Sequence, residues 1–185
     1  MSTGGYGVTV ARGASSVQAG FDSSRPLQLI FNLRSDIANA FRKRHISGFV
    51  RPGSCNAYAG VTVGREKELI GVFGVIVGTR TGAADILVKA DTIRSDIPKG
   101  GQLMSFLLVS GPMWRWLEER FCIQKPTVMT ACVSPYPSIA RYRAAAERTK
   151  TKRRSDGMYS LVYRFDMGKF PTVKAARAEW LRRLS

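Results

Sequence analysis

Short apolar runs with the composition of β-strands recur along the chain. Two of them, at 56–63 and 69–77, are separated by a polar stretch, which is typical of a β-hairpin. The other predicted strands lie at 27–31, 86–90, 127–133 and 159–165. The run at 127–133 is continuous rather than alternating, so it is predicted to be buried on both faces of a sheet.

Apolar residues at helical spacing predict the helices. The first covers about 35–44, and the longest begins near residue 100 and is interrupted by Gly111-Pro112, where a break or kink is expected. A basic helix is predicted over 138–149, with Ser138 as its cap. An amphipathic helix over 172–184 follows. This order predicts an α+β domain with a mixed, mostly antiparallel central sheet flanked by helices.

The length of 185 residues fits a single domain. Residues 1–26 are rich in Gly, Ser and Thr and are predicted to form a flexible N-terminal arm, with one domain over 27–185. No apolar run approaches the ~20 residues of a membrane span, and no secretory signal is evident, so a cytoplasmic protein is expected. The three cysteines form no CxxC pair and there is one histidine, so no metal site is predicted.

Positive charge is concentrated in the second half of the chain. The net charge is +16; residues 1–92 carry 11 basic and 6 acidic residues, whereas residues 93–185 carry 18 and 7. A polyanionic partner is therefore predicted, and nucleic acid is the commonest one. An anionic membrane surface is disfavoured because no basic helix ends in an apolar anchor.

The densest basic segment is 141–154, with one acidic residue, Glu147. Cations in such a segment neutralise phosphates, although a solvated helix end would look similar. Tyr136 lies between two prolines, where an exposed ring could stack on a base. The predicted nucleic-acid-binding residues are Arg42, Lys43, Arg44, Tyr136, Arg141, Arg143, Arg148, Lys150, Lys152, Arg153 and Arg154.

The predicted order of elements over roughly 27–165 resembles the GNAT acyltransferase fold. In that family a strand runs into a helix with the signature Asn-x-x-Ser-x-x-x-Tyr, and Pro135, Ser138 and Tyr142 occupy those places here. The family tyrosine often protonates the departing coenzyme A thiolate. The resemblance therefore implies this role for Tyr142.

Residues 94–102 stand where GNAT enzymes place their phosphate loop, Gln/Arg-x-x-Gly-x-Gly/Ala, but with different spacing. A glycine-rich loop at a helix start can cradle a phosphate through its N–H groups. Lys99, Gly100 and Gly101 are therefore predicted to bind a cofactor. The resemblance implies acetyl-coenzyme A or another small donor.

A narrower resemblance is to the Mom-type phage DNA-modification proteins. It rests on the layout of the segment 44–47, the Gly- and Val-rich strand 69–77, the altered phosphate loop and the Tyr142-Arg143 pair. That family converts adenine in DNA to an N6-carbamoylmethyl form that blocks restriction enzymes. The resemblance implies a transferase of phage origin in the host cytoplasm. It would move a small acyl-derived group to an exocyclic amine of DNA.

Four residues are candidates for proton transfer: Tyr142, Ser134, His45 and Asp91. Each has a structural alternative. Tyr142 could be a tyrosine at the edge of the core, Ser134 a turn residue and His45 a surface residue in a basic helix end, whereas Asp91 could cap the next helix. The basic neighbours of His45 should lower its pKa.

Two other functions remain open. One is a coenzyme A-dependent N-acetyltransferase acting on a protein or a small amine. The other is a non-catalytic nucleic-acid-binding protein on a GNAT-like fold, which the high positive charge fits equally well.

Overall fold

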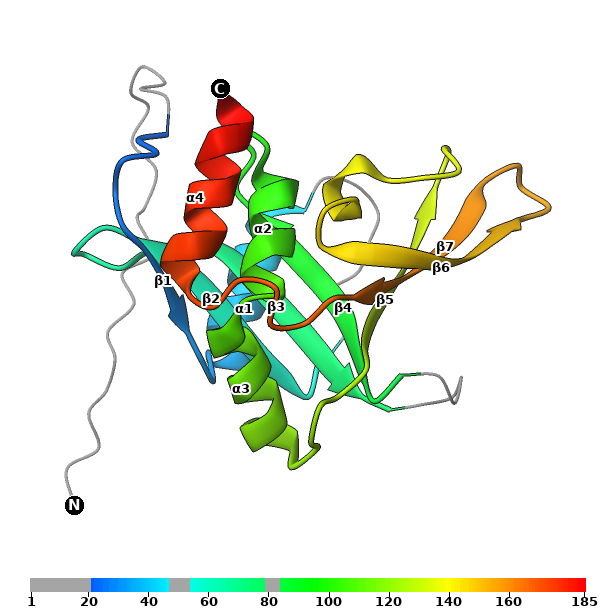
Figure 1. Ribbon diagram of the computed structural model, residues 1–185, viewed down its shortest axis with the longest axis horizontal. Coiled ribbons are helices and arrows are strands. Elements are labelled where there is room, and N and C mark those ends of the chain that lie inside the picture. The colour runs from blue at the N-terminus through cyan, green and yellow to red at the C-terminus, as the bar shows by residue number, and fades with distance from the viewer. Residues whose placement is uncertain (1–20, 47–53, 79–83) are drawn as a thin grey trace.

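The computed structural model describes residues 21–46, 54–78 and 84–185 (Figure 1). The elements are β1 (Leu27–Ile30), α1 (Ser35–His45), β2 (Ala57–Val63), β3 (Glu68–Val77), β4 (Ile86–Ile93), α2 (Gly100–Leu108), α3 (Gly111–Phe121), β5 (Val128–Ser134), the 3-10 turn η1 (Ala140–Tyr142), β6 (Ala146–Arg153), β7 (Tyr159–Phe165) and α4 (Val173–Leu184). The predicted α+β class is confirmed.

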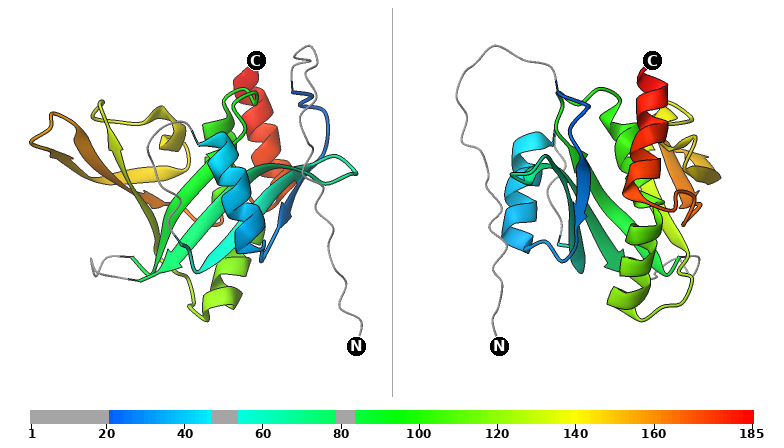
Figure 2. Two further views of the ribbon diagram at one scale, coloured as in Figure 1. Left: turned by 180° about the vertical axis from the view of Figure 1, so that it is seen from behind. Right: turned by 60° about the vertical axis from the view of Figure 1, so that its left-hand side comes forward.

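The described strands form one seven-stranded sheet in the order β1-β2-β3-β4-β5-β7-β6. Neighbours are antiparallel except for β4 and β5, which are parallel. Helix α1 contacts β2, β3 and β4 on one face, while α2, α3 and α4 lie on the other (Figure 2). The main core lies between the sheet and this second group of helices, with Phe73 and Trp180 fully buried in it.

Strands β4 and β5 pair only at their beginnings. Their register contains Ile86 opposite Val128 and Leu87 opposite Met129, and then the strands diverge (Figure 1). The Thr130 hydroxyl donates to the Val88 carbonyl oxygen at 3.0 Å just beyond the last pair. The divergence separates a lobe made of β5, β7 and β6, the β5–β7–β6 lobe, from the rest of the sheet.

A β-bulge in β4 sets the direction of the side chains that follow it. Val75 pairs with Val88, but Gly74 pairs with Ala90, so Lys89 is the extra residue. An extra residue moves all later side chains to the other face of the strand. As a result Asp91, which pairs with Phe73, lies on the face covered by α2.

The predicted basic helix over 138–149 is wrong. Only Ala140–Tyr142 forms a single 3-10 turn, and Ala146–Arg153 is the edge strand β6. The neighbouring β7 alternates buried Leu161, Tyr163 and Phe165 with more exposed residues, and β6 supplies its second hydrogen-bonding partner. Pairing within the sheet therefore overrides the helix preference of Arg and Lys.

The expectation that 127–133 is buried on both faces is also wrong. Ala131 is exposed and the side chain of Val133 is 50% exposed. These side chains are exposed because α1 covers only part of the sheet, where it contacts β2, β3 and β4. The face of β5 on the α1 side therefore has no helix from the described residues over it.

The break at Gly111-Pro112 is confirmed, because α2 ends at Leu108 and α3 begins at Gly111. Of the predicted arm, residues 1–20 lie outside the described residues, whereas the ring of Phe21 contacts Trp180 edge-on at 6.2 Å. In the described ranges, no helix is long and apolar enough to cross a membrane.

Candidate functional site

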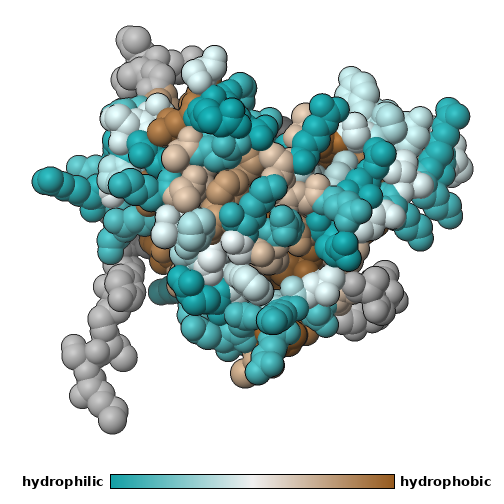
Figure 3. All heavy atoms as spheres, viewed as in Figure 1, coloured by the Kyte–Doolittle hydropathy of each residue, from teal (hydrophilic) through white to brown (hydrophobic). Residues whose placement is uncertain are grey.

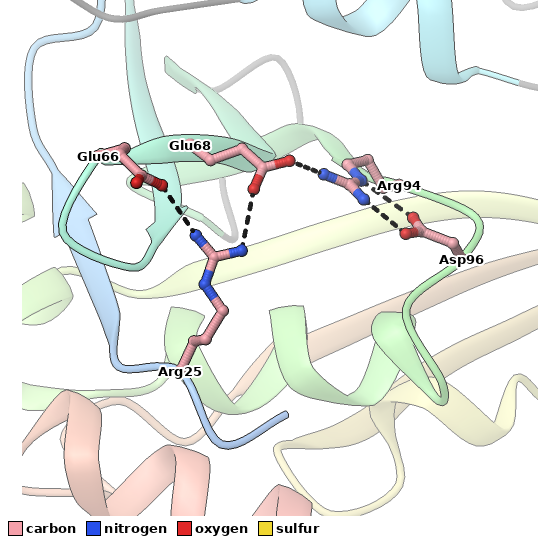
Figure 4. A network of polar contacts seen from close by, with 5 residues as sticks. All are labelled: Arg25, Glu66, Glu68, Arg94 and Asp96. Atoms are coloured by element: carbon pink, nitrogen blue, oxygen red, sulfur yellow. Dashed lines mark hydrogen bonds and ion pairs between the residues drawn. The ribbon is translucent and has the colours of Figure 1, made fainter. Parts of the chain in front are cut away.

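A network of ion pairs, in which basic and acidic side chains alternate, holds the loop between β4 and α2 (Figure 4). Arg25 binds Glu66 and Glu68, and Arg94 binds Glu68 and Asp96. This ion-pair network links the residues before β1, the β2–β3 turn and the predicted phosphate loop. Because two carboxylates face Arg94, its positive charge is already neutralised within the protein.

The loop before α2 also uses its own backbone donors. The N–H of Gly100 donates to the Ile97 carbonyl at 3.1 Å, and those of Gln102 and Leu103 donate to the Lys99 carbonyl at 2.9 and 3.2 Å. A helix start binds phosphate through N–H groups that are otherwise unpaired. Two of these groups, those of Gly100 and Gln102, are thus committed before any ligand arrives, whereas the Leu103 bond is the ordinary first bond of the helix.

Side chains cover this loop from two directions. The Trp180 indole N–H of α4 donates to the Pro98 carbonyl at 3.0 Å, and the Lys99 ammonium donates to the Arg183 carbonyl. On the other side, the Arg141 side chain lies 3.4 Å from the position that a Cβ atom on Gly101 would occupy. GNAT-like domains typically use acetyl-coenzyme A, but these residues do not fit a cradle for its pyrophosphate. The cofactor role of Lys99, Gly100 and Gly101 stays a prediction.

Where β4 and β5 diverge, Asp91, Arg141 and Tyr142 form a polar cluster. Arg141 Nη1 donates to Asp91 Oδ2 at 2.6 Å, and the Tyr142 hydroxyl donates to the same oxygen at 3.3 Å. Strand β4 supplies the carboxylate and η1 supplies the two donors. The bulge at Lys89 makes this contact possible, because it turns Asp91 toward η1.

Tyr142 is held as a neutral phenol. Its ring packs against Tyr163 and Phe165, and the side chain is buried. Burial, and then the negative charge of Asp91, raise the pKa of Tyr142 far above its usual range. The hydroxyl therefore stays protonated at neutral pH and donates a hydrogen bond.

Arg141 keeps its charge beside Asp91. Burial lowers its pKa, but the Asp91 carboxylate outweighs this effect and raises the pKa of Arg141 above its ordinary value. Asp91 accepts both hydrogen bonds at Oδ2, and within the described part of the chain Oδ1 has no hydrogen-bond partner. The arrangement thus combines a fixed carboxylate, one oxygen of which is open to an N–H donor, with a phenol that carries its proton at neutral pH.

Cys132 of β5 belongs to the surroundings of this cluster, although it is not among the predicted site residues. Burial raises the pKa of its thiol, Arg141 opposes this shift, and Asp91 adds to it. The thiol is therefore held in its neutral form rather than as a reactive thiolate. Arg141 had been predicted as a nucleic-acid contact, but its principal partner in the structure is Asp91.

Two predicted catalytic residues lie apart from the Asp91 cluster. The Ser134 hydroxyl accepts the N–H of Tyr136 at 3.1 Å and is buried, which is the geometry of a turn residue. His45 ends α1, where its ring packs on Phe41. Burial, and then the positive charges of Arg44 and Arg94, lower the pKa of His45, in the predicted direction, and Asp96 opposes them. Whether either residue takes part in catalysis stays a prediction.

The predicted nucleic-acid residues fall into two groups. Arg42, Lys43 and Arg44 lie in the last turn of α1, and Arg42 is buried. The others follow β5, with Tyr136 69% exposed in the loop and the cations of 148–154 on the exposed β6 and its turn. Figure 3 shows hydrophilic side chains over the end of the molecule formed by this hairpin.

Several of the hairpin cations have no partner within the described ranges. Arg148 donates to the Pro137 carbonyl and Arg154 pairs with Asp156. In contrast, the side chains of Lys150, Lys152 and Arg153 form no hydrogen bond or ion pair with the residues that the structure describes. Uncommitted cations on an exposed strand can bind an external polyanion without losing an internal contact.

Arg143 occupies a different place from the other basic residues. It lines a pocket of about 540 Å³ whose wall also contains Arg164, Phe165, Asp166 and Lys169. The side chains that line the pocket include charges of both signs, and Arg143 directly follows Tyr142 in the sequence. Among the described residues, no group of three or more His, Cys, Asp or Glu side chains could hold a metal ion.

The mixed sheet, with its parallel β4–β5 pair and the divergence that follows, is that of a GNAT-like domain. A family model described as the phage GNAT-like domain matches residues 28–185, and the chain belongs to this family. No curated protein and no solved structure matches the chain.

Proposed function

We propose that this protein transfers a small acyl-derived group to the exocyclic amine of a base in DNA, with adenine as the acceptor. The cluster of Asp91, Arg141 and Tyr142 carries the proposal. It lies where β4 and β5 separate, and it contains a proton acceptor and a proton donor in contact. Membership in a GNAT-like family makes acyl transfer the reaction class to test first.

The proposed chemistry needs one proton acceptor and one donor. As the amine nitrogen bonds to the carbon of the donor group, that nitrogen loses a proton to Asp91 Oδ1. The leaving group departs with the electrons of its bond to that carbon and takes the proton of the Tyr142 hydroxyl. Asp91 then releases the proton from Oδ1 to water, and the Tyr142 oxygen takes a proton from water, so both groups return to their starting states. Arg141 keeps the carboxylate in place throughout.

A nucleic-acid acceptor is supported by the positive charge of the second half of the chain and by the uncommitted Lys150, Lys152 and Arg153. An enzyme that modifies a base in a duplex must first turn it out of the stack. The exposed ring of Tyr136 follows β5 and is the residue that we expect to stack on such a base.

Mass spectrometry of nucleosides tests the proposal. DNA from cells that express the protein should contain a modified adenosine that is absent from uninduced cells and makes the DNA resistant to restriction enzymes. Asp91→Asn and Tyr142→Phe should abolish it. Asp36→Asn on α1 and Tyr159→Phe on β7 make the same chemical changes outside the cluster and should retain it. Unmodified DNA, or equal loss in all four variants, would overturn the assigned roles.

A second candidate is a non-catalytic nucleic-acid-binding protein on the same fold. The internally bonded loop before α2 favours it, because the Gly100 and Gln102 N–H groups and the Lys99 ammonium already have partners within the protein. Salt-sensitive DNA binding without any change in nucleoside mass would support this function over transfer.

A further inference from the structure

One face of the β5–β7–β6 lobe is open. The register places side chains of three strands on it: Ala131 and Val133 of β5 lie opposite Val162 and Ser160 of β7, and these lie opposite Lys150 and Lys152 of β6. Leu161, Tyr163 and Phe165 point to the other face, into the main core. We call the first set the open face. It is completed by the pair Arg164 and Glu147.

No described helix covers the open face. Helix α1 contacts β2, β3 and β4, and η1 contacts α2 on the opposite side of the sheet. The view from behind shows the lobe extending beyond α1 (Figure 2). On β5, Val133 is 50% exposed in the last row of the face, opposite Ser160.

The charge on this face is positive at its edge. Arg164 is paired with Glu147 at 2.9 Å, whereas Lys150 and Lys152 have no partner among the described residues. Lys150 and Lys152 are two positions apart on β6, so their side chains lie on the same face, about 7 Å from each other along the strand. The face therefore has an apolar centre beside a row of cations, which complements a polyanion.

We infer that duplex DNA binds across the open face, with the β6–β7 edge in its major groove. This inference rests on the nucleic-acid partner of the proposed function and specifies its form. The major groove of B-DNA, about 12 Å wide, admits a two-stranded β-ribbon, and β6 with β7 forms such a ribbon at the sheet edge. The major groove of A-form RNA is too narrow to be read by side chains.

The side chains of the open face favour a duplex over a single strand. Single-stranded nucleic acids are bound by stacking on aromatic rings, and the described residues of this face include no aromatic side chain. Val133, Val162 and Ala131 are suited to apolar contact with thymine methyl groups, while Lys150 and Lys152 bind phosphates.

Substitution of an exposed valine tests which face binds. Val133→Glu places a negative charge on the open face, in the row that ends at Lys152, and we expect at least tenfold weaker binding to a 20-base-pair DNA duplex. Val77→Glu is the matched control, because Val77 is 44% exposed and lies on the opposite face of β3. Circular dichroism confirms that both variants are folded. Equal affinities of the two variants would overturn the inference.

The salt dependence of binding tests the role of the lysines. Each phosphate contact contributes about 0.9 to the slope of log K against log salt, so Lys150→Gln with Lys152→Gln should reduce the slope by about 1.8. Arg65→Gln with Lys174→Gln removes the same charge from exposed sites on the β2–β3 turn and α4, and should leave the slope unchanged. An equal reduction in both double variants would refute a specific contact.

The full-length protein should also bind the duplex more tightly than the same sequence as single-stranded DNA or as double-stranded RNA. The reverse order would overturn the inference. These results are separable from the nucleoside assay. Modified adenosine with no effect of Val133→Glu on binding would leave the proposed function standing and refute the open face, whereas face-specific binding without modification would do the opposite.

Discussion

Replacing Asp91 with asparagine removes one negative charge and keeps the size of the side chain. In the native protein Arg141 and Tyr142 both donate to Asp91 Oδ2, at 2.6 and 3.3 Å. A neutral amide oxygen is a weaker acceptor for both donors. The charge of Arg141 would then stand without its partner beside the buried ring of Tyr142.

The size of the effect follows from the exposure of the pair. Exposed ion pairs contribute about 0–1 kcal/mol, whereas breaking a buried pair costs about 3–5 kcal/mol. The Asp91 side chain is 20% exposed and that of Arg141 is 38% exposed, so water screens part of the interaction. We therefore expect Asp91→Asn to lower the free energy of unfolding by about 2 kcal/mol. Tyr142→Phe keeps its ring contacts and should cost about 0.5–1 kcal/mol.

Urea denaturation measures these losses, and Asp36→Asn is the matched control. Asp36 pairs with Arg34, and their side chains are 62% and 77% exposed, so its loss should stay below about 1 kcal/mol. Equal losses for Asp91→Asn and Asp36→Asn would refute the argument that the Asp91–Arg141 pair is partly shielded from water.

Three further predictions concern stability. Gly64→Ala should lower the free energy of unfolding, measured by urea denaturation, by about 1 kcal/mol more than Gly157→Ala. Both glycines have φ near +75°, but only a Cβ atom at position 64 would overlap the Arg25 guanidinium. Equal losses in the two variants would contradict this reasoning. The lowered pKa of His45 means that the unfolded chain binds its proton more tightly. The free energy of unfolding should therefore fall as the pH drops below 6.5. The variant His45→Gln should show a weaker dependence of Tm on pH, and an unchanged dependence would contradict this reasoning. Trp180→Ala should cost about 3–5 kcal/mol in urea denaturation, and a loss below 1 kcal/mol would contradict the anchoring role of α4.

Local patterns predicted the elements whose partners are close in sequence. The hairpin of β2 and β3 follows from two strand-like runs around a short polar turn, and Gly64 supplies the positive φ that this turn needs. The break at Gly111-Pro112 follows from backbone chemistry alone. In each case the residues that decide the structure lie within a few positions of one another.

The basic segment could not be assigned in the same way. Residues 146–153 contain Arg, Lys and Glu, which favour helices, with two threonines at alternate positions that suit a strand. The deciding factor is β7, whose free edge must form backbone hydrogen bonds. That requirement depends on the sheet as a whole and is invisible in the segment itself.

The candidate site was half predicted. Asp91 and Tyr142 were each chosen as candidates, but their contact joins residues 51 positions apart. Whether Asp91 faces η1 depends on a single extra residue in β4, since without the bulge at Lys89 the carboxylate would point toward α1. No periodicity in the sequence marks that residue, so the partnership with Arg141 could not be predicted.

The divergence of β4 and β5 links the candidate site to the open face. Because β5 pairs with β4 only through Val128 and Met129, the backbone beyond these residues leaves the plane that α1 covers (Figure 1). On the α2 side this separation gives Asp91 room to meet η1 rather than a neighbouring strand. On the other side it leaves Val133 and the β6 lysines exposed. One feature of the sheet thus places a small polar cluster on one face and leaves a broad basic surface exposed on the other.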